Sequence, residues 1–268
     1  MQTETKPCRY GKMTYLPHDR YIGRSLQVYG EYSEMEMVLM QHLVRPSDTV
    51  LDVGANIGVF TAGLARAVSA MGAVHAFEPQ PAIHELLSLN ISQNNLRQVT
   101  PHKKAAGAAA GTIRVPPRDY DSVGNFGGVS LGGELGEEVP VITIDSLQLG
   151  RLRLMKIDVE GMEIDVLRGA EATIRRCEPA IYVENDRDQL SEKLIAHIFG
   201  LEYRLWWCVT PMFNPDNFFR HAEDVFGNVW SCNMIGLPRT AGVSLPFAEV
   251  LTPQDVARTP DGQVFNFA

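Results

Sequence analysis

The sequence predicts an α/β fold in which helices cover both faces of a mostly parallel sheet. From about residue 49 onward, short apolar runs rich in β-branched residues alternate with helical patterns. Such an alternation is typical of strand–helix–strand units, whose strands are parallel and whose crossovers are right-handed. The chain of 268 residues, 45% of them hydrophobic and 21% charged, is long enough to bury one substantial core.

The positions of the expected elements follow from this pattern. Strands are expected at 49–53, 73–77, 99–104, 152–159 and 179–184, and helices at 59–70, 82–90 and 163–177. The Gly-, Ser- and Asp-rich stretch 107–136 indicates a hairpin or a mobile loop, followed by a strand at 139–144. Two late strands, 203–209 and 229–237, have no helical pattern between them, so they are expected to pair antiparallel.

The two ends of the chain lie outside this alternation. Residues 1–45 are expected to form a helical cap segment, because YGEYSEMEMVLMQHLV predicts an amphipathic helix with Ser33 as N-cap and Glu36 as its capping-box partner. The expected boundaries are therefore the cap segment, a main domain over 46–240 with a Pro-, Asn- and Phe-rich insert at 210–227, and a C-terminal tail over 241–268.

Charge and composition exclude several classes of function. The formal net charge of −8 and the absence of a Lys/Arg stripe argue against nucleic acid as a partner. The four cysteines show no C-x-x-C spacing, so neither a zinc site nor a disulfide framework is indicated. No apolar run approaches the roughly 20 residues of a membrane helix, and the chain starts polar. We therefore expect a cytoplasmic protein without a membrane partner; its oligomeric state stays open, with a homodimer as one alternative.

The loop after the first expected strand, LDVGANIGVFT, is typical of nucleotide-binding folds. A dinucleotide loop requires G-x-G-x-x-G, but here Asn56 stands where the second glycine should be, between Gly54 and Gly58. Asp52 just before the loop disfavours a pyrophosphate and suits a ligand with a positive group. S-adenosylmethionine carries an ammonium, a sulfonium and a carboxylate, and the carboxylate would lie against the N–H groups that open the next helix, near Thr61.

Glu78 supports an adenosine-containing ligand. It follows Gly58 by 20 residues and lies at the end of the second strand, in VHAFEPQ. A carboxylate at this place can accept hydrogen bonds from both ribose hydroxyls, for NAD as well as for S-adenosylmethionine. The loop, rather than Glu78, therefore distinguishes the two ligands.

Seven segments of the sequence together match the pattern of a known family: YGEYSEMEM (29–37), VLDVGANIGVFT (50–61), AFEPQP (76–81), NFGGVSL (125–131), KIDVEGMEIDVLRGA (156–170), YVEND (182–186) and SCNMIGLPR (231–239). By these segments the chain resembles the FkbM family of S-adenosylmethionine-dependent methyltransferases. The resemblance implies a class I methyltransferase fold, with a Rossmann-like sheet of seven mostly parallel strands whose last strand is antiparallel. It also implies O-methylation of a hydroxyl, commonly on a sugar or a polyketide-type natural product, with S-adenosylhomocysteine as the second product.

The resemblance also implies which residues bind the donor. By motif these are Asp52, Gly54, Asn56, Thr61 and Glu78, with Gly58 closing the loop. Adenine recognition is expected from backbone groups near Ala106 and from the loop that ends at Asn125, since Ala105 and Ala106 are small. Tyr32 and Glu36 would place the front helix over the donor.

Acidic residues follow the fourth and fifth expected strands. In KIDVEG, Lys156, Asp158 and Glu160 fall at i, i+2 and i+4 and so share one face of a strand; Glu184 and Asp186 do the same in YVEND. They predict either a general base for an alcohol or a cation site made of carboxylates. Alternatively, Asp158 or Glu160 caps the helix that starts at Glu163, with Lys156 paired to one of them.

The acceptor site is expected on the late insert and the front helix. The insert is expected to act as a lid; His221 and three phenylalanines within it either contribute to the acceptor site or anchor the insert. Metal-free base catalysis is favoured because Lys156 would repel a divalent ion, although Asp158 and Glu160 are the ligands if the enzyme is metal-dependent. The alternatives are N-methylation of a peptide or amino sugar, a nicotinamide-dependent oxidoreductase, and a non-catalytic donor-binding protein.

Overall fold

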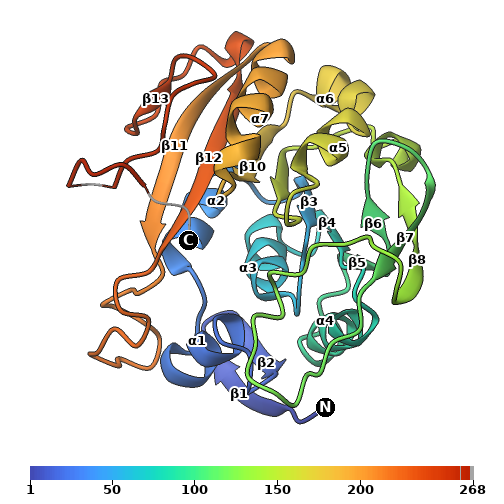
Figure 1. The fold of residues 1–268 in the computed structure, drawn as a ribbon, viewed down its shortest axis with the longest axis vertical. Helices are drawn as coiled ribbons and strands as arrows, with labels where there is room; N and C mark the ends of the chain where they lie inside the picture. The colour runs from blue at the N-terminus through green and yellow to red at the C-terminus, as the bar shows by residue number, and fades with distance from the viewer. Residues whose placement is uncertain (260, 266–268) are drawn as a thin grey trace.

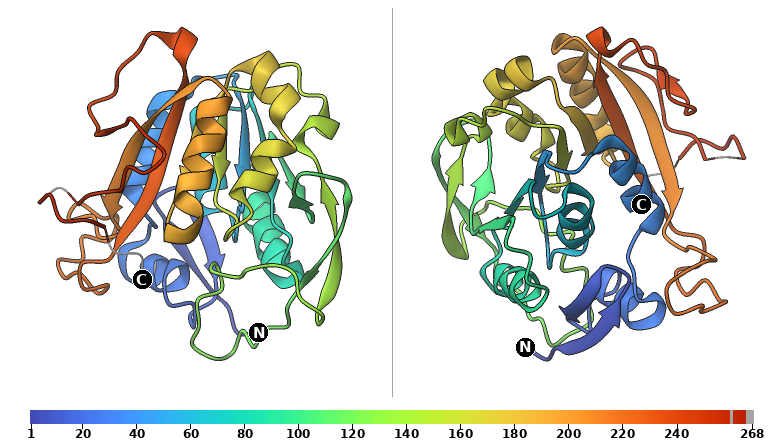
Figure 2. Two further views of the ribbon diagram at one scale, coloured as in Figure 1. Left: turned by 45° about the horizontal axis from the view of Figure 1, so that its top comes forward. Right: turned by 180° about the vertical axis from the view of Figure 1, so that it is seen from behind.

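The central sheet of the computed structural model has eight strands in the order β13-β11-β12-β10-β9-β3-β4-β5 (Figures 1 and 2). The structure describes residues 1–259 and 261–265. The strands are β3 (Thr49–Val53), β4 (Ala73–Phe77), β5 (Val99–His102), β9 (Leu154–Ile157), β10 (Ala180–Glu184), β11 (Tyr203–Pro211), β12 (Trp230–Pro238) and β13 (Glu249–Val250).

The topology confirms the expected fold class. Strands β5, β4, β3, β9 and β10 pair in parallel, whereas β12 runs antiparallel to both β10 and β11. This is the mostly parallel sheet with an antiparallel last strand. The two-residue strand β13, which pairs with β11 at the edge, adds an eighth strand to the seven expected.

Helices cover both faces of the sheet, as expected for a mostly parallel sheet. Successive residues of β3 enter two different apolar clusters, Val50 into one and Leu51 into the other. The first cluster contains α2 (Glu34–Leu43), α3 (Val59–Val68) and α4 (Pro81–Gln93), and the second contains α5 (Glu163–Arg168), α6 (Glu171–Cys177) and α7 (Asp188–Gly200).

One helix was expected where the chain forms α5 and α6. The interruption lies at Gly169, where a Cβ atom would come 2.0 Å from the carbonyl oxygen of Gly107. The chain therefore approaches a neighbouring backbone here, which only glycine allows. Helix α7 was not predicted at all.

The front segment contains more than helices. A hairpin of β1 (Glu4–Cys8) and β2 (Gly11–Tyr15) precedes α1 (Ile22–Tyr29). Asn90 of α4 fastens this hairpin, because its side chain accepts the N–H of Thr14 at 2.7 Å and donates to the Thr14 carbonyl at 3.0 Å. The expectation of a purely helical cap was therefore wrong.

A three-stranded sheet of β6 (Ala105–Ala106), β7 (Gly111–Val115) and β8 (Glu137–Ile142) flanks the central one. Strands β7 and β8 pair antiparallel, which makes 107–136 a hairpin with a long connection. The short 3-10 helices η1 (Ile144–Leu147) and η2 (Arg239–Ala241) complete the secondary structure of the described chain. Among the described residues no helix is long and apolar enough to cross a bilayer.

Candidate active site

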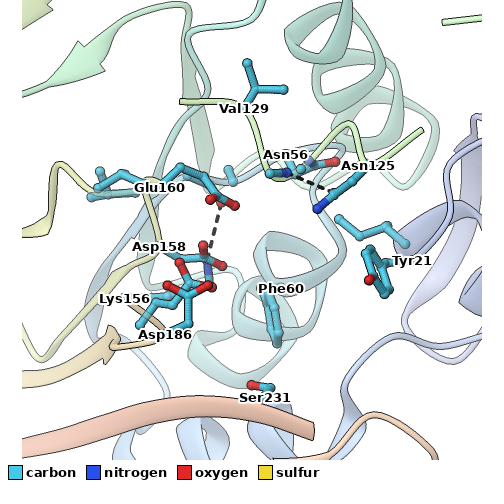
Figure 3. A pocket seen from close by; sticks show the side chains of 18 of the residues that line it. Tyr21, Asn56, Phe60, Asn125, Val129, Lys156, Asp158, Glu160, Asp186 and Ser231 are labelled. Atoms are coloured by element: carbon cyan, nitrogen blue, oxygen red, sulfur yellow. Dashed lines mark hydrogen bonds and ion pairs between the residues drawn. The ribbon is translucent and has the colours of Figure 1, made fainter. Parts of the chain in front are cut away.

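A cavity of about 590 Å³ opens at the carboxyl ends of β3, β4, β9 and β10. Open α/β sheets bind their ligands at this edge, because the loops that leave parallel strands converge there. Figure 3 shows Lys156, Asp158 and Asp186 grouped on one side of the pocket, with Glu160 above them, Phe60 beside them and Ser231 below. Asn56 and Asn125 lie on the other side.

The loop from β3 to α3 lines the cavity through Gly54, Ala55 and Asn56. Gly54 has a φ of 83°, and a Cβ atom there would lie 1.7 Å from the carbonyl oxygen of Asp158. Because Gly54 has no side chain, its backbone can lie against the backbone of the loop after β9. Gly58, the N-cap of α3, does not line the cavity; a Cβ atom on it would meet Leu87 at 2.7 Å.

Glu78 is a buried carboxylate in the cavity wall, only 3% exposed. Its Oε2 accepts the N–H of Asn56 at 2.9 Å, and its Oε1 accepts the N–H of Gln80 at 2.8 Å. Burial raises the pKa of Glu78 to about 7, although these backbone N–H groups act in the opposite direction. The side chain is thus fixed at the end of β4 with lone pairs to spare.

Asp52 and Thr61 lie beneath the cavity and not in its wall. Both are 0% exposed, and the Thr61 hydroxyl donates to Asp52 Oδ2 at 2.6 Å. Burial raises the pKa of Asp52, and Lys156 opposes this. Asp52 and Thr61 were expected to contact the donor directly. In the structure their side chains bind each other instead and do not line the cavity.

Lys156 contacts Asp52, Asp158 and the loop from β3 to α3. Its Nζ lies 3.2 Å from Asp158 Oδ2, 3.4 Å from Asp52 Oδ1 and 3.3 Å from the Gly54 carbonyl oxygen. The same atom lies 5.1 Å from the centre of the Phe60 ring. Burial acts to lower the pKa of Lys156, but Asp158 and Asp52 outweigh it and raise the pKa. A lysine that stays protonated cannot act as a general base.

The carboxylates that follow β9 and β10 do meet at the cavity. One oxygen each of Asp158, Glu160 and Glu184 lies within 4.8 Å of the other two. Burial, and next to it the charge of Asp158, raises the pKa of Glu160 to about 7 and the pKa of Glu184 well above its usual value. Glu160 pairs with Arg187, whereas Glu184 Oε2 is buried without a hydrogen-bond partner in the described chain.

The alternative role of these acids as helix caps is wrong. The N-cap of α5 is Met162, and no side chain caps it. Glu163 instead turns back and accepts the N–H groups of Val159 and Gly161 at 3.3 and 3.0 Å. Asp158 and Glu160 therefore remain in the wall of the cavity.

Comparison with known proteins identifies the family. The model described as the methyltransferase FkbM domain matches residues 52–205, more than half of the chain. The chain belongs to the FkbM methyltransferase family. The matched segment of the chain contains the loop after β3, Glu78 and the acidic residues at the ends of β9 and β10.

Named relatives are more distant. The chain is 27% identical over 150 residues to Methyltransferase 1 of Beauveria bassiana and 28% identical over 153 residues to the hexuronic acid methyltransferase AglP of Haloferax volcanii. These matches cover 47% and 55% of this chain and 60% and 59% of the relatives, so the chain spans about three fifths of their lengths. A crystal structure of methyltransferase FkbM from Methylobacillus flagellatus superposes with a TM-score of 0.48 at 22% identity, covering 73% of this chain and 45% of that one.

The front segment of this member of the FkbM family contributes unevenly to the cavity. Tyr32 lines it and packs its ring edge-on against Phe60 at 5.9 Å. Glu36 does not line it, because its carboxylate accepts hydrogen bonds from Ser33, Ser231 and Tyr182. Ser33 is the N-cap of α2, as predicted, but its hydroxyl binds the Glu36 side chain and no N–H, so the expected capping box was wrong.

The predicted adenine-side residues do lie in the cavity wall. Ala105, Ala106 and Asn125 line it, and Asn125 Oδ1 accepts the N–H of Gly128 at 2.9 Å. The connection between β7 and β8 is held by Phe126, whose carbonyl accepts the Gln80 side chain at 3.0 Å and whose N–H donates to Asp19 at 3.3 Å.

The late insert packs on the front segment, and Met212 is the one residue of 210–227 that lines the cavity. The Phe213 and His221 rings of the insert pack on Tyr29 at 5.5 and 5.8 Å, so His221 lies outside the cavity wall.

Trp206 and Trp207 are buried away from the cavity, whereas Trp230 lines it. Sequence reasoning missed Trp230 and Ser231, and also a C-terminal stretch of cavity-lining residues: Thr259, Gln263, Val264 and Phe265. Of the expected tail 241–268, residues 260 and 266–268 lie outside the described residues.

Proposed function

We propose that this chain is an S-adenosylmethionine-dependent methyltransferase that methylates a hydroxyl of a small molecule, with a sugar or polyketide-type compound as the acceptor class. One observation carries the proposal: a single cavity has the Gly54–Asn56 loop and Glu78 on one side and the carboxylates after β9 and β10 on the other. The first side suits the donor and the second suits the acceptor. The Haloferax relative, named for a hexuronic acid, supports a sugar ring as the acceptor, but not the charge that this ring carries in the present chain.

The donor side fits S-adenosylmethionine by its chemistry. The carboxylate of Glu78 keeps free lone pairs and would accept hydrogen bonds from the ribose hydroxyls. Asn56 replaces the glycine that a pyrophosphate requires, and Ala106 with Asn125 would border the adenine. Four further residues would act on donor binding indirectly, because they hold the shape of the loop: Gly54, Gly58, Asp52 and Thr61.

The acceptor side supplies a base and keeps it in place. When bound, S-adenosylmethionine would supply an electrophilic methyl carbon: a C–O bond to the acceptor would form as the C–S bond breaks, and the thioether would leave as S-adenosylhomocysteine. In the proposed mechanism Asp158 takes the proton of the acceptor hydroxyl, and Lys156 holds the Asp158 carboxylate by the 3.2 Å contact. Positioning of the acceptor oxygen supplies much of the remaining rate enhancement.

Tyr32, Glu36 and the insert 210–227 would shape the acceptor half of the cavity. Tyr32 contacts Phe60, Met212 lies in the wall, and Glu36 fixes Ser231. In this proposal residues 46–240 bind the donor, and the front segment and the insert complete the acceptor site.

Two measurements test the proposed function. Calorimetry should show binding of S-adenosylmethionine and S-adenosylhomocysteine, and far weaker binding of NAD. An assay for S-adenosylhomocysteine over a panel of hydroxyl compounds should then reveal the acceptor. An affinity for NAD comparable to that for S-adenosylhomocysteine would overturn the donor assignment.

A further inference from the structure

The acceptor wall carries more negative than positive charge. This wall is the part of the cavity lined by Tyr32, Trp230, Ser231 and the charged residues that follow or end β9 and β10. Its charged residues, of those that the structure describes, are four carboxylates, Asp158, Glu160, Glu184 and Asp186, and one cation, Lys156; the cavity's other lysine, Lys104, precedes β6, and its other carboxylate, Glu78, follows β4. Lys156 is shared between Asp158 and the buried Asp52, and Arg187, which lies behind the wall, pairs with Glu160 and more loosely with Asp186 at 3.8 Å. Glu184 has no cationic partner within ion-pair distance in the described chain, and its buried Oε2 accepts no hydrogen bond.

Three side-chain donors on the same wall, those of Lys156, Trp230 and Ser231, are already engaged. The three protons of Lys156 face Asp158, Asp52 and the Gly54 carbonyl, as described above. Trp230 donates its Nε1–H to Asn228 at 3.1 Å. Ser231 donates to Glu36 at 2.5 Å and accepts from Asn233 at 2.6 Å, so only a lone pair is left for a ligand. Apart from the hydroxyl of Tyr32, the wall therefore offers a ligand mainly hydrogen-bond acceptors, and a ligand that binds the carboxylates must bring the donors.

We infer that the acceptor carries a protonated amino group, beside the hydroxyl that is methylated, and that this group docks between Asp158, Glu160 and Glu184. The inference rests on the proposed function. Three oxygens within 4.8 Å of one another have a common centre no more than about 2.8 Å from each (4.8 Å divided by √3). That is the length of a charge-assisted N–H···O hydrogen bond, and an ammonium has three protons to donate.

A divalent metal ion fits the same place less well. Mg²⁺ requires six oxygen ligands at about 2.0–2.1 Å. Lys156 and Arg187 already pair with two of the three carboxylates and would repel a second cation of higher charge. Burial, and next to it the charge of Asp158, raises the pKa of Glu184 well above its usual value, and no Lys or Arg of the described chain lies within ion-pair distance of this carboxylate.

The test uses three sugars of similar size and different charge. Glucosamine is a cation, glucose is neutral and glucuronate is an anion. Each is titrated into the protein saturated with S-adenosylhomocysteine, whose own amino group is then already bound, and binding is followed by saturation-transfer NMR. Glucosamine should bind at least about tenfold more tightly than glucose, which is the worth of one hydrogen bond between charged groups, and glucuronate more weakly than glucose.

Two variants connect the preference to the wall. Glu184→Gln keeps the shape and removes the charge, so the advantage of glucosamine over glucose should fall below about threefold. Asp186→Asn, at a more exposed carboxylate of the same wall, should reduce it less. Glu202→Gln, at an 82% exposed glutamate outside the cavity wall, is the control and should keep the full preference.

The outcomes separate this inference from the proposed function. Absence of S-adenosylhomocysteine binding in the wild type would refute the proposed function itself. Normal S-adenosylhomocysteine binding with equal affinities for the three sugars, with tighter binding of glucose or glucuronate, or with no binding of glucosamine would overturn only the inference. Calorimetric binding of Mg²⁺ that disappears in Glu184→Gln would assign the carboxylates to a metal ion and overturn it as well.

Discussion

The carboxylate of Glu31 accepts the backbone N–H of Phe218 at 2.7 Å, although the two residues are 187 positions apart. The same carboxylate accepts hydrogen bonds from Arg9 at 2.7 Å and from the Asn214 side chain at 2.8 Å, and it is only 3% exposed. Glu31 therefore fastens the late insert to the front segment.

Replacement of Glu31 should loosen the insert and destabilise the fold. Glu31→Ala leaves Arg9, Asn214 and Phe218 without their shared partner, and we expect a loss of about 2–4 kcal/mol in the free energy of unfolding, measured with urea. Asp216→Ala in the same insert is the control, since its 89% exposed ion pair with Arg220 should contribute less than about 1 kcal/mol. Equal effects of the two variants would show that Glu31 does not anchor the insert.

Glu78 should contribute directly to donor affinity. Glu78→Ala removes a charged hydrogen-bond acceptor and should weaken the binding of S-adenosylhomocysteine by about 1.5–3 kcal/mol in calorimetry. Glu85→Ala, an exposed acid on α4, is the matched control and should bind as the wild type does. Wild-type affinity in Glu78→Ala would remove this residue from the donor site.

The pH dependence of stability should report the burial of Glu78. Its pKa rises from 4.5 to about 7 in the folded protein, so between these values the folded protein keeps a proton that the unfolded chain has lost. Stability therefore falls as pH rises through this window, by about 3 kcal/mol for this group.

Glu78→Gln, which does not titrate, should remove that part of the slope in urea unfolding at pH 4.5 to 7. Other buried acids, Glu160 among them, titrate in the same direction and will leave a remaining slope. A variant slope identical to that of the wild type would contradict the assignment.

Asp158 should affect turnover and leave donor binding alone. Asp158→Asn keeps the shape but cannot accept the proton of the acceptor, so we expect a rate about 100- to 10,000-fold lower. Affinity for S-adenosylhomocysteine, measured in parallel, should change little. Full turnover by Asp158→Asn would exclude it as the base and would leave Glu184, with its free buried oxygen, as the next candidate.

Gly54 should be required for folding of the site more than for ligand contact. In Gly54→Ala the new Cβ would lie 1.7 Å from the Asp158 carbonyl oxygen at a φ of 83°, so β3 and β9 must separate. We expect a loss of about 3 kcal/mol or more in stability, with donor binding lost in consequence. Gly111→Ala is a control with no atom within 4 Å of the new Cβ and should lower the melting temperature little.

The parts of the fold that were predicted correctly are those with local signals. The runs at β3 and β4 are apolar and β-branched and are bounded by turns, so their bounds agree with the sequence pattern. The meeting of Asp158 with Glu184 was also predictable, because each follows a parallel strand and neighbouring parallel strands end at one edge. The parallel pairing of β9 with β10 therefore brings the motifs KIDVEG and YVEND, which are distant in sequence, to one cluster of carboxylates.

Other features depend on contacts that no local pattern reports. Asp52 belongs to a donor motif, yet its side chain is directed beneath the cavity and meets Thr61 and Lys156. Glu36 was expected at the donor, but three hydroxyl groups hold it behind Ser231. The hairpin of β1 and β2 has few apolar residues and is fixed by Asn90, which is distant in sequence.

The pairing of β11 with β12 suggests how related enzymes could change their acceptors. The two strands are in register over nine residue pairs, from Tyr203 opposite Pro238 to Pro211 opposite Trp230, and the insert leaves from the last of these pairs. A longer, shorter or different loop grafted at that point would alter the acceptor wall while the ladder behind it stays closed. Glu78 and the loop after β3 lie on other strands, so donor binding would persist through such an exchange. If the proposed function holds, the hairpin would therefore let the acceptor wall vary between relatives while the donor-binding side stays the same.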